Sequence, residues 1–151
     1  MVNRYRYFMK AAIPCIFALL LFTSPFCAPA AERDSCVICG MYLDIYAKTR
    51  WTIILDNGSF QSTCSLACAA KIIQVRTGHI RNIKVADFRS GALIDARSAF
   101  FLEGSDIPGV MSYTSRIAFP SKEAARDFRK KHGGRIIPFD EALQNQLKER
   151  E

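Results

Sequence analysis

The sequence lacks the short motifs of the common hydrolases and nucleotide-binding enzymes. It contains no G-x-S-x-G nucleophile turn, no phosphate-cradling glycine-rich loop and no HExxH metalloprotease motif. Asp56, Asp106 and Asp140 lie in predicted turns or at a predicted helix start, where their hydrogen bonds to the backbone explain them. We therefore expect a binding protein and not an enzyme.

The chain also has little excess charge once its first residues are set apart. Lys and Arg number 21 and Asp and Glu 14, a net charge of +7, but residues 1–30 hold three of the bases and no acid. The other residues carry 18 bases and 14 acids, or +4, and their longest basic run is Arg129-Lys130-Lys131. We therefore expect no nucleic-acid partner. The length of 151 residues and the 50% hydrophobic content fit one globular domain and exclude a disordered chain.

Residues 1–30 have the layout of a secretory signal peptide. A polar, basic head precedes an uncharged apolar stretch at 11–22, and the small residues Ala28-Pro29-Ala30 follow. The stretch is shorter than the ~20 residues of a membrane-spanning helix and contains Pro14. We expect cleavage after Ala30, which leaves residues 31–151 as the working domain in a bacterial periplasm.

Two alternatives remain open for this segment. An uncleaved segment would anchor the domain in the membrane. Lipid attachment at Cys27 would tether it, although Phe26 stands where lipoprotein signals have a small residue. Only in these two cases do we expect the protein to contact a membrane.

Hydrophobic periodicity predicts an α+β domain made of two strand–strand–helix–strand repeats. In the first repeat, Asn57-Gly58 between apolar runs predicts a hairpin with a type I′ turn. Ser62 or Thr63 is expected to cap the helix that follows. The expected elements are strands at 51–55, 60–63, 83–88 and 92–95, and a helix that begins after Thr63 and ends at Thr77-Gly78.

The second repeat shows the same order. Ser121 is expected to cap its helix, Glu123 to lie in the first turn, and Gly133-Gly134 to end it. Asp140 is expected to cap a last helix. The expected elements are strands at 99–102, 116–119 and 135–139, and helices over 122–132 and 141–148.

The spacing of the cysteines points to the chemistry. Cys15 and Cys27 lie in the predicted signal, and the working domain keeps Cys36-x2-Cys39 and Cys64-x3-Cys68, separated by 24 residues. The first pair lies on a tight knuckle that Gly40 allows to turn. The second pair lies at a helix start, where residues i and i+4 share a face and free amides favour thiolate. A knuckle joined to a helix start is the arrangement of treble-clef zinc sites.

Three chemistries compete for these sulfur atoms. Four thiolates hold Zn²⁺ tetrahedrally, and thiolates with a thioether select Cu(I). Close cysteine pairs in an oxidising compartment also form structural or redox disulfides. The CxxC motif precedes the hairpin, whereas a thioredoxin-type motif follows a strand and opens a helix. This order favours metal binding over a thiol oxidoreductase.

Methionines and histidines add candidate ligands. Met41 lies two residues from Cys39 and can donate to the same ion. Met111 follows the turn at Pro108-Gly109, and core packing is the alternative role of both methionines. His79 and His132 each lie beside a glycine that ends a helix, where an imidazolium also suits the helix dipole.

Several of these motifs together resemble a known family. They are Cys36-Val-Ile-Cys39-Gly-Met41, the hairpin, the block from Gly104-Ser105-Asp106 to Met111, the strand ending at Phe119, and Phe128 to Gly134, which span roughly residues 34–142. This set is similar to the NosL family, periplasmic copper-binding accessory proteins of nitrous-oxide reductase. The spacing of Cys64 and Cys68 resembles the TRASH and YHS metal-binding modules.

The resemblance implies a NosL-like metal-binding domain over 31–151, with a treble-clef-like first half. It implies that the protein delivers Cu(I) to an exported copper enzyme such as nitrous-oxide reductase, with a membrane copper transporter as a further partner. The family's C-x-M step and later methionine match Cys39, Met41 and Met111, with Cys36, Cys64 and Cys68 as assisting metal ligands. A structural zinc module of the TRASH type and a periplasmic thiol oxidoreductase stay open as alternatives.

Overall fold

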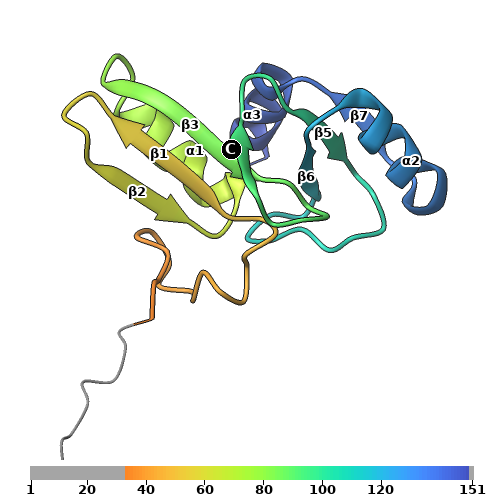
Figure 1. Cartoon of the computed structure of the whole chain (residues 1–151), viewed down its shortest axis with the longest axis horizontal. Coiled ribbons are helices and arrows are strands. Elements are labelled where there is room, and N and C mark those ends of the chain that lie inside the picture. Colours follow the sequence, from red (N-terminus) through yellow and green to blue (C-terminus); the bar gives the residue numbers. More distant parts are fainter. Residues whose placement is uncertain (1–32, 150–151) are drawn as a thin grey trace, which may run out of the picture. The chain divides into compact units, whose positions relative to one another are not determined.

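The computed structural model describes residues 33–149, and the predicted signal peptide with Cys15 and Cys27 lies outside them. Within 33–149, two strand–strand–helix–strand repeats follow each other, as predicted, with β4 after the first repeat and α3 after the second (Figure 1). In chain order the elements are β1 (Trp51–Leu55), β2 (Phe60–Thr63), α1 (Leu66–Val75), β3 (Ile80–Ala86), β4 (Leu93–Asp95), β5 (Phe100–Glu103), β6 (Arg116–Phe119), α2 (Lys122–His132), β7 (Arg135–Ile137) and α3 (Phe139–Lys148).

The first repeat forms an antiparallel sheet in the order β2-β1-β3-β4. Alternate residues of β1 are buried, and the register pairs Trp51 with Val85 and Ile53 with Ile83. These side chains share one face because side chains alternate along a strand. Helix α1 covers this face with Leu66, Ala69 and Ile72, which belong to the same hydrophobic cluster.

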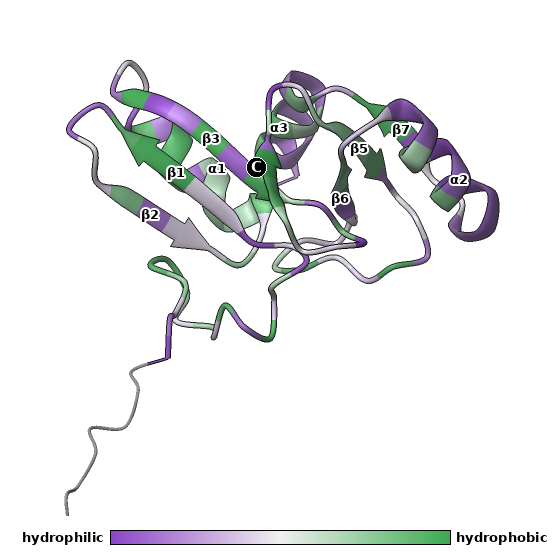
Figure 2. Ribbon diagram, viewed as in Figure 1, coloured by the Kyte–Doolittle hydropathy of each residue, from purple (hydrophilic) through white to green (hydrophobic). Residues whose placement is uncertain are grey.

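The second repeat forms an antiparallel sheet in the order β6-β5-β7. The central strand β5 is buried on both faces. Phe101 joins the cluster of the first repeat and stacks on Trp51 at 5.6 Å between ring centroids. Leu102 points to the other side, where Phe119 of β6 and Ala125 of α2 lie in a second cluster. Most residues of α2 are hydrophilic (Figure 2).

The hairpin turn differs from the predicted type I′. A type I′ turn needs positive φ at two residues, but Asn57 has negative φ and only Gly58 is left-handed, with φ of +82°. The backbone amides of Gly58 and Leu55 donate to the carbonyls of Leu55 and Ser59, which closes a three-residue loop. The Asn57 side chain accepts from the amide of Ser59 at 3.0 Å, a local bond that stabilises this alternative turn.

The predicted N-caps of two helices were also wrong. Ser65, and neither Ser62 nor Thr63, is the N-cap of α1, because β2 extends through Thr63. Pro138 precedes α3, and Asp140 lies inside its first turn. The prediction for α2 is confirmed: the Ser121 side chain accepts from the amide of Ala124, and Gly133 ends the helix with φ of +69°.

Four strands begin or end one to three residues away from their predicted bounds. In place of 83–88, 92–95, 99–102 and 135–139, the strands run over 80–86, 93–95, 100–103 and 135–137. Among residues 33–149 we find no helix with the length and apolar character that a bilayer crossing requires.

Candidate metal centre

The first pair of cysteines lies on a closed knuckle that precedes β1. The Cys36 amide donates to the Met41 carbonyl and the Gly40 amide to the Cys36 carbonyl, both at 2.8 Å. Gly40 has φ of +78°, as the sequence predicted, which lets the chain reverse within this short segment. The amide of Val37 donates to the Ser62 carbonyl at 3.2 Å and so attaches the knuckle to β2.

The second pair lies where β2 passes into α1. Cys68 is in the first turn of the helix, whereas Cys64 precedes the N-cap and is not helical. The side chains nevertheless point the same way, with the two Sγ atoms 3.8 Å apart. The hydroxyl of Thr49 donates to the Cys64 carbonyl at 2.8 Å and fixes this turn from the segment before β1. Thr49 had no local signal in the sequence.

The four cysteines converge. All four Sγ atoms lie within 4.8 Å of one another, and those of Cys39 and Cys64 are 3.5 Å apart. Four sulfurs around one ion at ~2.3 Å stand ~3.8 Å apart, so this set fits a thiophilic ion. Cys36, Cys64 and Cys68 are buried, and Cys39 is half-buried. Within residues 33–149 the structure shows all four as free thiols.

The thiols differ in how readily they lose a proton. A hydrogen bond from the Cys64 thiol lowers the pKa of Cys68 to about 5, although burial opposes ionisation. The same contact, with burial, raises the pKa of Cys64. Burial also raises the pKa of Cys39, which the backbone amide of Met41 partly offsets. The contact between the two thiols therefore favours the proton on Cys64 and the thiolate on Cys68.

The predicted methionine ligands lie in different environments. Met41 is half-buried and packs against the cysteine cluster. Val110 also packs against the cluster, and the next residue, Met111, is 55% exposed with a positive φ of 57°. Leu43 and Tyr46 are the other apolar residues that pack with the cysteines, and neither was predicted at the site from the sequence. Cys39, Met41 and Met111 as copper ligands thus remain a prediction.

The two histidines lie elsewhere. Nδ1 of His132 is 2.9 Å from a carboxylate oxygen of Asp106, and its ring stacks on Phe128 at 4.0 Å. His79 is exposed and lies immediately before β3. In the described part of the chain, the group of candidate metal ligands consists of the four cysteines without either histidine.

Known proteins resemble this chain in sequence and in fold. The NosL family model matches residues 28–147. The copper-binding lipoprotein NosL of Stutzerimonas stutzeri is 37% identical over 130 residues, covering 78% of this chain and 66% of that protein. The HTH-type transcriptional repressor CutR of Bacillus subtilis is 26% identical over 98 residues, covering 65% of this chain and 52% of the repressor. The chain therefore spans between half and two thirds of the length of these relatives.

A solved structure shares the fold. The crystal structure of the copper chaperone NosL from Shewanella denitrificans superposes with a TM-score of 0.60 at 22% identity, covering 78% of this chain and 96% of that one. The similarity confirms the predicted fold class, a mixed α and β domain with antiparallel sheets.

Proposed function

The chain belongs to the NosL family, and from this premise we propose that it is a copper(I)-binding metallochaperone. The convergence of four cysteine sulfurs within 4.8 Å is the observation that carries the proposal. Thiolates and thioethers are soft donors, and soft donors select Cu(I) over hard cations. The relatives named for copper support the same chemistry.

We assign the ligands by their position and exposure. Cys39 is the most accessible of the four cysteines, and Met41 lies beside it against the cluster. We propose Cys39, Met41 and Met111 as the copper ligands, with Cys36, Cys64 and Cys68 assisting from the buried side. An accessible ligand is the one that an approaching partner can replace first.

Transfer then proceeds by exchange of sulfur ligands. Each Cu–S bond formed with the partner replaces one Cu–S bond to this chain, and the released thiolate takes up a proton. Copper stays in the +1 state throughout, so no electron donor is needed. The step is binding and release, in accord with the prediction that the protein is not an enzyme.

The partner and the compartment extend the proposal. We propose delivery to an exported copper enzyme of the nitrous-oxide reductase type, with a membrane copper transporter as a source of the ion. This requires export of residues 31–151 to the periplasm by the segment 1–30. Secretion of a reporter enzyme fused to residues 1–30 tests the export.

A structural zinc module is the second candidate, because four thiols at these distances also suit tetrahedral Zn²⁺. In that case zinc co-purifies at one ion per chain, and chelation unfolds the protein. A copper chaperone instead keeps its fold without metal. The hydrophobic clusters that hold the two sheets are separate from the cysteine cluster, so we expect the metal-free protein to stay folded, which favours the chaperone.

One experiment separates these candidates. The reduced protein is loaded anaerobically with Cu(I) or Zn²⁺, and native mass spectrometry and X-ray absorption count the ions and the metal–sulfur bonds. We expect one Cu(I) with sulfur ligands, and a changed copper spectrum in the Cys39→Ala, Met41→Ala double variant. No Cu–S signal, or a spectrum that this variant leaves unchanged, would refute the proposal.

A further inference from the structure

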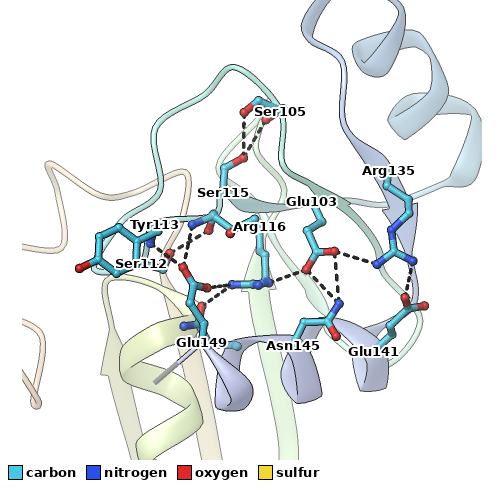
Figure 3. A network of polar contacts seen from close by, with 12 residues as sticks. Glu103, Ser105, Ser112, Tyr113, Ser115, Arg116, Arg135, Glu141, Asn145 and Glu149 are labelled. Atoms are coloured by element: carbon cyan, nitrogen blue, oxygen red, sulfur yellow. Dashed lines mark hydrogen bonds and ion pairs between the residues drawn. The ribbon is translucent and has the colours of Figure 1, made fainter. Parts of the chain in front are cut away.

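The segment between β5 and β6, residues 104–115, is a loop that carries Met111. Its base is closed by the Gly104 amide, which donates to the Ser115 carbonyl at 2.9 Å. The hydroxyls of Ser105 and Ser115 lie 3.0 Å apart beside it (Figure 3). These contacts hold the two ends of the loop together but leave its tip to be held by other residues.

The tip has a conformation that needs support. A Cβ atom at Gly109 would lie 2.3 Å from the Ser112 carbonyl oxygen, so the backbone folds tightly back on itself here. Met111 is the one non-glycine residue with positive φ that the structure shows between residues 33 and 149. A side chain in this region persists only where its surroundings impose the conformation, and such residues gather at functional sites.

A carboxylate from the end of α3 supplies that support. Oε1 of Glu149 accepts hydrogen bonds from the amides of Tyr113 and Thr114, at 2.6 and 2.8 Å (Figure 3). Its other oxygen accepts from Arg116 at 2.6 Å. Arg116 is nearly buried and also donates to Glu103 at 2.8 Å, so the carboxylate is itself fixed in place.

The same loop also reaches the metal centre. Val110 packs against the cysteine cluster. Gly109, Val110 and Ser112 also line a narrow crevice, and residues at the start of α1, Ser65 and Leu66, line the same crevice. Val110, the residue before Met111, therefore contacts the cysteine cluster, and Glu149 holds the loop at Tyr113, two residues after Met111.

We propose that Glu149 is a positioning residue of the copper site. Its carboxylate fixes the loop so that Met111 keeps its left-handed conformation and presents its thioether next to the cysteine cluster. Glu149 does not touch the ion and acts through Met111. This inference rests on the proposed function, since it assumes that Met111 is a copper ligand.

A double-mutant cycle with Met111 tests the inference. Cu(I) affinity is measured anaerobically by competition with bicinchoninate for the wild type, Glu149→Ala, Met111→Leu and the double variant. We expect Glu149→Ala to weaken Cu(I) binding by about tenfold, as for other residues that orient ligands. In the Met111→Leu background the same change should have no further effect, because the ligand through which it acts is gone.

Further variants separate positioning from loss of stability. Glu141→Ala is the matched control, because Glu141 lies on the same helix but its carboxylate pairs with Arg135 and not with the loop amides. It should bind Cu(I) like the wild type. Glu149→Gln keeps an acceptor for the two amides and loses the ion pair with Arg116, so an intermediate affinity is expected. Hydrogen exchange at Tyr113 and Thr114 should accelerate in Glu149→Ala.

Each outcome is decisive. Wild-type affinity in Glu149→Ala, or additive losses in the double variant, would overturn the positioning role while copper binding stands. A wild-type protein that does not bind Cu(I) would instead refute the proposed function.

Discussion

The contact between Phe101 and Trp51 should account for a large share of the stability of the fold. Phe101 lies on β5 of the second repeat, is fully buried, and stacks on Trp51 of β1 at 5.6 Å with an interplanar angle of 14°. The ring centroid of Phe139, on α3, lies 6.2 Å from that of Phe101. One side chain thus connects the sheet that follows the cysteine knuckle with the sheet that flanks the Met111 loop.

Truncation of this side chain to alanine should be severely destabilising. Buried Phe→Ala changes cost about 3–5 kcal/mol of unfolding free energy, from lost transfer energy and the cavity left behind. The lost ring stacking adds about 0.5–1.5 kcal/mol. We therefore expect Phe101→Ala to lower the unfolding free energy by about 5 kcal/mol, against a total of about 5–15 kcal/mol for a domain.

Urea unfolding of the reduced, metal-free protein measures this loss. Trp51 is the one tryptophan in the chain, so its fluorescence reports on the contact itself. Phe60→Ala is the matched control, because Phe60 is 69% exposed on β2, and it should change stability by less than about 0.5 kcal/mol. Similar losses in both variants would refute the role of the stack in joining the two sheets.

Three further outcomes are expected. Burial raises the pKa of Glu103, but hydrogen bonds from Asn145, Arg116 and Arg135 outweigh burial and lower the pKa below its ordinary value. The ionised carboxylate therefore stabilises the fold above about pH 4.3, and this stabilisation is lost as the pH falls through the lowered pKa. In urea titrations the unfolding free energy of Glu103→Gln should accordingly be lower than that of the wild type at neutral pH and equal to it in acid. A Cβ atom at Gly58 would lie in open space, but the positive φ strains any residue with a side chain. Thermal melting should therefore show that Gly58→Ala lowers the unfolding free energy by about 1–2 kcal/mol. Gly134→Ala should cost more, because its Cβ would lie 2.7 Å from the Glu103 carbonyl oxygen, and equal losses would contradict the packing. Cu(I) at a free concentration about 100 times its dissociation constant should stabilise the protein by about 2.7 kcal/mol, and Cys64→Ala should reduce that gain in the same melts.

The sequence by itself determined the elements and their order. β-Branched and aromatic residues identified β1, and Ser121 with Gly133 marked both ends of α2, because these signals act within a few residues. The same local chemistry predicted the positive φ of Gly40. The hairpin at Asn57-Gly58 was predicted correctly, but its turn type and the caps of α1 and α3 were predicted wrongly. At such positions several neighbouring residues can serve, and the strands and packing around them decide which does.

The tertiary structure decided what the cysteines can do together. The sequence supplies two pairs 24 residues apart, and only the hairpin between them, with the knuckle bonded to β2, brings four sulfurs within 4.8 Å. The same holds for Glu149, which bonds the amide of Thr114 across 35 residues of sequence. Such contacts leave no periodic signal, because they depend on where separate elements pack and not on the residues beside them.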